Sequence, residues 1–151
     1  MAKFHALFLS MLLLAACQTT PPSPSTATGL SQKMDSLYTL VVAKHDSIMP
    51  KIGNIEAYQF QLRKLTATDS LSIEEKKAAL LILAQLKKGH EAMFDWMNAF
   101  KNPHLNEDFY AQSSEKELWS YLQTEEDKIE EVTKLMQNSM QQAQNFLEER
   151  K

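Results

Sequence analysis

The chain has 151 residues, with 16 lysines and arginines against 19 aspartates and glutamates, which gives a formal net charge of −3 at pH 7. This acidic balance argues against nucleic acid as a partner, because nucleic-acid binding requires a concentration of positive charge. Cys17 is the only cysteine, so a disulfide within one molecule is excluded.

Residues 1–16 have the pattern of an export signal. Lys3 and His5 form a short basic start, and residues 6–16 are apolar apart from Ser10. The apolar run is too short to span a bilayer, for which a helix needs about 20 residues. A short apolar run behind a basic start is typical of a signal peptide.

The segment ends in Leu14, Ala15, Ala16 and Cys17. These residues resemble the lipobox of bacterial lipoproteins, so we predict that the mature chain begins at a lipidated Cys17. Each methylene of an acyl chain contributes about 0.8 kcal/mol to membrane anchoring. The alternative is an ordinary secretory signal with an incidental cysteine. An aspartate after the cysteine would favour the inner membrane, so Gln18 resembles the outer-membrane type, and we expect a lipid-anchored protein that faces the periplasm.

Residues 17–30 form a predicted tether between the anchor and a domain over residues 31–151. Proline, serine and threonine dominate the tether, which is uncharged and reaches about 40 Å if it is extended at 3.1 Å per residue. After residue 30, apolar residues recur every three or four positions, which is the helical period. We therefore predict an all-α domain, an elongated three-helix bundle that runs up, down and up.

The first helix is predicted over residues 31–66, with a kink or break at Pro50, because the proline ring removes an N–H group and clashes with the preceding turn. This segment is basic and residues 107–151 are strongly acidic, so the two are expected to lie side by side. The predicted buried seam of the bundle is Met34, Leu37, Val41, Ile48, Ile55, Tyr58, Leu62, Leu65, Ala79, Leu83, Leu86, His90, Met93, Met97, Phe100, Leu118, Leu122, Glu125, Ile129, Val132, Met136, Ser139, Ala143 and Phe146.

The second and third helices have recognisable starts. Ser72 with Glu75, and Ser114 with Glu117, have the Ser-x-x-Glu spacing of a capping box, in which each side chain binds the other residue's backbone N–H. Residues 101–113, between these two helices, are predicted to be a loop.

Lys44, His90 and Glu125 are the polar exceptions in the predicted seam. If the turns centre near Asp69 and near residues 107–108, antiparallel pairing places all three at about one level. We predict a buried polar layer in which Glu125 pairs with His90 or Lys44 and fixes the register of three similar helices.

A soft-metal site is the alternative at this level, with His45, Met49, His90 and Met93 as ligands. Imidazoles and thioethers suit Cu(I). Methionine is also a common core filler, and the chain has no dense tract of methionine or histidine, so we predict no cofactor. We also expect no enzymatic activity, because the sequence assembles no nucleophile, oxyanion site and pocket.

Two stretches carry a family resemblance: HDSIMPKIG at residues 45–53 and MFDWMNAF at residues 93–100. They resemble a group of small helical lipoproteins of Bacteroidota, often labelled "viral A-type inclusion protein", a label that reflects helical character. The resemblance covers residues 40–100 well and the third helix loosely. It implies a fold and a location, and no activity.

Ser36, Ser47 and Ser70 each follow an aspartate and precede an apolar residue. This pattern resembles the O-glycosylation sequon of exported Bacteroidota proteins, and ordinary helix-cap chemistry is the alternative. Ser70 is the best placed because it lies in a predicted turn, whereas Ser47 is expected to be hidden in the packed helix.

Phe94, Trp96, Trp119 and Tyr121 lie off or beside the seams, where they either close the core or form an aromatic patch for a partner. We therefore predict a structural or protein-interaction lipoprotein, whose partner is an envelope protein complex at the outer membrane. The alternatives are a periplasmic lipoprotein that binds a ligand or copper, and a holdase-type chaperone.

Overall fold

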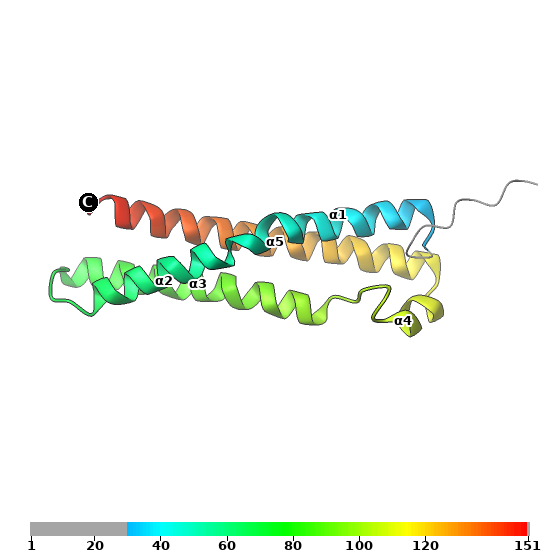
Figure 1. The fold of residues 1–151 in the computed structure, drawn as a ribbon, viewed down its shortest axis with the longest axis horizontal. Coiled ribbons are helices and arrows are strands. Elements are labelled where there is room, and N and C mark those ends of the chain that lie inside the picture. Colours follow the sequence, from blue (N-terminus) through cyan, green and yellow to red (C-terminus); the bar gives the residue numbers. More distant parts are fainter. Residues whose placement is uncertain (1–29, 151) are drawn as a thin grey trace, which may run out of the picture.

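The computed structural model of the protein describes residues 30–150, which form an elongated helical bundle (Figure 1). These residues contain no strand, so the predicted all-α class is confirmed. The predicted signal peptide, Cys17 and the tether up to residue 29 lie outside the described residues.

The bundle has three layers of helix, which run up, down and up. The first layer consists of two helices joined by a 3-10 turn, and a short helix lies between the second and third layers. The elements are α1 (Gln32–Ile48), η1 (Met49–Lys51), α2 (Ile52–Thr66), α3 (Ile73–Ala99), α4 (Glu107–Gln112) and α5 (Glu115–Glu148).

Both predicted capping boxes are confirmed. At the start of α3, the Glu75 amide donates to Ser72 Oγ at 3.2 Å, and the Ser72 amide donates to Glu75 Oε2 at 2.8 Å. Ser114 and Glu117 repeat this arrangement at the start of α5. Each box satisfies amide groups that the first turn of a helix leaves without an intrahelical partner, so both helices begin at defined residues.

The first helix is broken at Pro50. A break was one of the two predicted outcomes, and a kink was the other. Without an N–H, residue 50 makes no hydrogen bond to the carbonyl of Asp46, and the chain makes a 3-10 turn before it becomes helical again. The two halves have different neighbours. α1 packs along α5, whereas α2 packs mainly along α3 (Figure 1).

The predicted seam is confirmed for α5, in which all nine predicted positions are buried. It is partly wrong for α3, in which Ala79, Leu86 and Met93 are buried as predicted but the positions between and after them are displaced by one residue. Ile82, Gly89 and Trp96 are buried, in place of the predicted Leu83, His90 and Met97. The displacement arises because the row through Gly89 faces α5, while His90 points toward α2. The run of apolar residues from Leu80 to Leu83 gives no sequence signal that separates these two rows.

The predicted loop at residues 101–113 contains α4. After α3 ends, the chain continues along the bundle axis before it turns back (Figure 1). Phe109 and Tyr110 of α4 pack against a second small core, formed by Met34, Leu37, Leu118 and Leu122. The start of α5 therefore extends past the end of α3, and Phe100 stacks on Tyr121 with ring centroids 6.4 Å apart.

Replacing Gly53 by alanine should stabilise the protein, because a Cβ atom there meets nothing within 4 Å. We expect the Gly53→Ala variant to raise the free energy of unfolding by about 0.5–1 kcal/mol, since glycine is a poor residue inside a helix. Urea unfolding followed by circular dichroism measures this change.

Gly89→Leu is the contrasting variant. A Cβ at Gly89 would already lie 3.4 Å from the Cα atom of Met136 and from Ser139 Oγ, so a larger side chain must displace α5. We expect the free energy of unfolding to fall by about 1–3 kcal/mol. Equal effects of the two substitutions would contradict this packing.

Candidate functional site

The predicted buried polar layer does not form, because its members have different partners. Lys44 of α1 binds Glu126 Oε1 and Glu130 Oε2 of α5, each at 3.0 Å, and remains partly exposed. These two hydrogen bonds raise the pKa of Lys44. The predicted pairing of the basic first segment with the acidic third helix therefore occurs, but beside the core and without Glu125.

His90 and Glu125 lie far apart. His90 is partly exposed, and its Nε2 atom lies 3.5 Å from Glu56 Oε1 of α2. The adjacent Gly89 lies against Met136, about three turns or 16 Å further along α5 than Glu125. The predicted register was wrong because α4 and its loop extend the bundle, so that α3 meets a later part of α5.

The four residues of the predicted metal site share no common centre. The ring of His45 stacks on Trp96, with centroids 5.5 Å apart, and Trp96 is about 9 Å along α3 from His90. Ligand nitrogens lie about 2 Å from a bound metal, so the two imidazoles are too far apart to share one ion. Met93 is fully buried in the core, and Met49 packs against its edge.

Glu125 is the one buried carboxylate of α5, with 2% of its surface exposed. Lys128 donates to its Oε1 at 2.8 Å, whereas its Oε2 has no hydrogen-bond partner within residues 30–150. Its neighbour one turn earlier is Tyr121, whose hydroxyl accepts a hydrogen bond from the Lys101 amide at 2.6 Å. Burial, strengthened by the charge of Glu125, raises the pKa of Tyr121 to about 12.

An aromatic cluster, of which Phe109 and Tyr121 line the same hollow as Glu125, fills the space between α1, the end of α3 and α4. Trp96 stacks on Phe100 at 4.8 Å, and Phe109 packs edge-on against Tyr121 at 5.1 Å. Aromatic pairs of this kind contribute about 0.5–1.5 kcal/mol beyond their buried area. The cluster, which the sequence patterns did not predict as a unit, comprises Tyr38, His45, Trp96, Phe100, Phe109, Tyr110 and Tyr121.

The predicted aromatic partner surface is corrected by this packing. Trp96 is only 7% exposed and closes the core, and Tyr121 is half-buried in the aromatic cluster. Trp119 is half-buried at the other side of α5, where it packs with the second core. Phe94 remains exposed, beside the ring of His90. The four residues therefore do not form one face.

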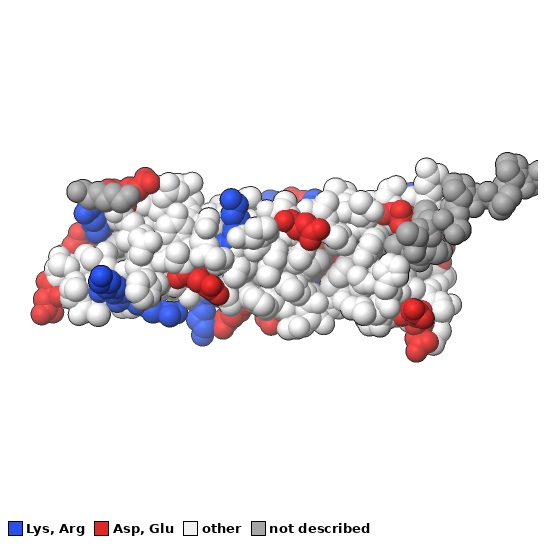
Figure 2. Space-filling model, viewed as in Figure 1, with Lys and Arg blue, Asp and Glu red and all other residues white. Residues whose placement is uncertain are grey.

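Large apolar side chains are exposed instead on the hairpin of α2 and α3. Phe60 is 70% exposed and Ile73 is 83% exposed, and Leu80 and Leu81 are also more than half exposed. The sequence contains the signal for this surface, since all four lie outside the predicted seams. In the view of Figure 2 the charged side chains lie at the ends of the molecule, over α1 and along the lower edge, and few lie between α2 and the C-terminal half of α5.

The three predicted glycosylation serines are exposed. The Ser36 hydroxyl donates to the Gln32 carbonyl and the Ser47 hydroxyl to the Lys44 carbonyl, each at 2.8 Å. Ser47 was expected to be hidden, and this expectation is wrong, because its side chain lies on the exposed side of α1. Ser70 lies in the turn between α2 and α3, so accessibility alone does not distinguish the three.

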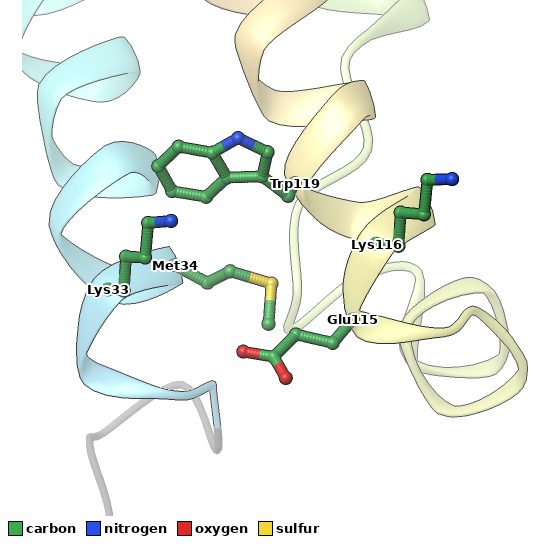
Figure 3. Close-up of a pocket in the computed structure, with 5 residues that line it drawn as sticks. All are labelled: Lys33, Met34, Glu115, Lys116 and Trp119. Atoms are coloured by element: carbon green, nitrogen blue, oxygen red, sulfur yellow. The ribbon is translucent and has the colours of Figure 1, made fainter.

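A hollow of about 380 Å³ lies at the start of α1 and α5 (Figure 3). Met34 and Trp119 lie between the two helices, and Glu115 lies beside Met34, while Lys116 points away. The Lys33 ammonium lies 3.9 Å from the centroid of the Trp119 ring, which is a cation–π contact. This hollow therefore already holds a cation of the chain itself.

Within the described part of the chain, no group of three or more histidine, cysteine, aspartate or glutamate side chains is placed to hold a metal ion. None of its helices is long and apolar enough to cross a membrane. The chain matches no protein-family model, no curated protein and no solved structure.

The ion pairs of Glu130 should make stability depend on acidity. Lys134 and Lys44 lower the pKa of Glu130 from 4.5 to about 2. Because the unfolded chain binds the proton more readily, this contribution is present above pH 4.5 and is lost as the pH falls toward 2. The Glu130→Gln variant should therefore lose less unfolding free energy than the natural chain between pH 5 and pH 3, measured by urea unfolding.

Glu131→Gln is the matched control, since Glu131 is an exposed neighbour on the same helix. It should keep the pH dependence of the natural chain. Identical profiles for the natural chain and for Glu130→Gln would contradict the bridge between α1 and α5.

Proposed function

We propose that the chain is a lipid-anchored lipoprotein of the cell envelope, a structural or protein-interaction subunit at the periplasmic face of the outer membrane. The anchor rests on the lipobox that ends at Cys17, and the uncharged tether after it supplies reach. The resemblance to small helical lipoproteins of Bacteroidota supports the same location.

The observation that carries the interaction role is the exposed apolar surface of the α2–α3 hairpin. We define this hairpin surface as Phe60, Ile73, Leu80 and Leu81. The turn that joins α2 to α3 lies at the opposite end of the bundle from the start of α1 (Figure 1). A chain anchored through its N-terminal tether would therefore present this surface far from its attachment point. Exposed apolar side chains that gather in one region mark interaction sites, and these four large side chains belong to one helical hairpin.

The alternative functions receive less support from the geometry. A copper carrier would need His45 and His90 to meet, and they lie at different levels of the bundle. A holdase would need an accessible apolar interior, and the seams of all three layers are packed against one another. The described residues therefore favour docking through a surface over capture in a cavity.

Co-purification of the tagged full chain from native membranes, after chemical cross-linking, tests this role. The natural chain should recover an envelope protein. The double variant Phe60→Ser, Leu80→Ser should recover it at least about tenfold less well, since central apolar contacts commonly contribute 2 kcal/mol or more to an interface. The substituted side chains are exposed, so the fold should be preserved.

The double variant Leu40→Ser, Leu105→Ser is the matched control, because it removes two exposed leucines outside the hairpin surface. It should recover the partner as the natural chain does. The Cys17→Ser variant should no longer be recovered with the membrane fraction, and this result tests the lipid anchor separately. Recovery of no envelope protein by the natural chain, or equal recovery by both double variants, would overturn the interaction role.

A further inference from the structure

The break at Pro50 opens a groove between α2 and α5. α1 follows α5 closely, but after η1 the chain turns toward α3. The groove has a volume of about 470 Å³. In Figure 2 the surface between α2 and the C-terminal half of α5 is largely uncharged. Its lining residues, which we call the amide groove, are Lys51, Asn54, Tyr58, Gln137, Asn138, Met140, Gln141 and Gln144.

The chemistry of the amide groove differs from that of the remaining surface. Five of its eight lining side chains are carboxamides, and Lys51 is the only charged one. The half-buried side chains of Tyr58 and Met140 pack against the core and supply an apolar floor. In a small-molecule site, apolar contact supplies affinity and polar groups supply orientation. This groove offers both kinds of contact, with polar groups in the majority.

The composition of α5 supports a role for this wall beyond solubility. Residues 135–147 contain no charged side chain, although the preceding turns of the same helix are rich in glutamate and lysine. Asparagine forms helices less readily than glutamate, glutamine or lysine, so Asn138 does not serve to stabilise the helix. Its exposed position beside Gln137 and Gln141 instead extends a continuous neutral wall.

We propose that the amide groove binds a short neutral saccharide. A sugar ring has an apolar C–H face, which suits the floor of Tyr58 and Met140, and hydroxyl groups at its rim. Gln141 and Gln144 each donate one hydrogen within α5, to Asn145 Oδ1 and to Glu148 Oε1. Each of these amides retains a second donor and its acceptor, so the wall can pair with hydroxyls in either role. A neutral ligand is favoured because a single lysine gives no dense positive charge for an anion.

The groove is short and has a single apolar floor, and these two properties together favour a saccharide over a peptide. The wall from Gln137 to Gln144 is about 10 Å long at 1.5 Å per residue, which accommodates only a few units of either polymer. A peptide that short would have to bind chiefly through side-chain pockets, and the groove has a single apolar floor. This inference does not depend on the hairpin surface or on its partner.

Isothermal titration calorimetry of the full chain in detergent tests the inference, with maltotriose, cellotriose and chitotriose as probes and trialanine as the peptide comparison. At least one saccharide should bind. The double variant Gln141→Ala, Gln144→Ala should bind it about tenfold more weakly, which is the effect of losing one or two hydrogen bonds. Both positions are exposed, and alanine favours the helix, so the variant should fold.

The matched control is Gln123→Ala, Gln142→Ala, which removes two exposed carboxamides of α5 outside the groove. It should bind as the natural chain does. Side-chain amide signals in nuclear magnetic resonance spectra should shift for groove residues and not for Gln123. Binding of none of the three saccharides, equal weakening by both variants, or binding of trialanine alone would overturn the inference.

Discussion

Pro50 cannot donate a backbone hydrogen bond, and its ring excludes the straight continuation of α1. The chain therefore makes a 3-10 turn and leaves α5 for α3. A straight first helix would continue along α5, which α1 follows. The broken helix packs its two halves mainly against different partners, α1 against α5 and α2 against α3. The main features of the bundle follow from this change of partner.

Because the two halves pack against different helices, a gap lies beside each half, on opposite sides of the first helix. Side chains fill one of these gaps and leave the other open. Between α1 and α3, the aromatic cluster fills the space, with Trp96 and Phe100 reaching toward His45 and Tyr38. Between α2 and α5, Tyr58 covers only the floor of the gap, and the amide groove remains above it. One half of the bundle is therefore closed by apolar burial, and the other carries an accessible polar hollow.

The sequence predicted what depends on local chemistry and on helical period. The capping boxes, the break at Pro50 and the buried row of α5 are of this kind. It did not predict what depends on register, because α4 lies in a segment with loop composition and displaces the level at which α3 meets α5. In the predicted layer, His90 lies apart from Glu125 for that reason, whereas Lys44 stays near the level of Glu125 but binds Glu126 and Glu130 instead. The amide groove had a sequence signal, the uncharged run at residues 135–147, but its meaning required the divergence of α2.

The central claim is that Pro50 separates α2 from α5 while α1 stays against it. Pulsed electron paramagnetic resonance tests it with nitroxide pairs at the exposed residues Ala43 and Gln123 and at Ala57 and Gln142, in a Cys17→Ser background. The second pair should be further apart than the first, and Pro50→Ala should shorten only the second distance. Equal distances for the two pairs, or a Pro50→Ala variant with both distances unchanged, would contradict the account.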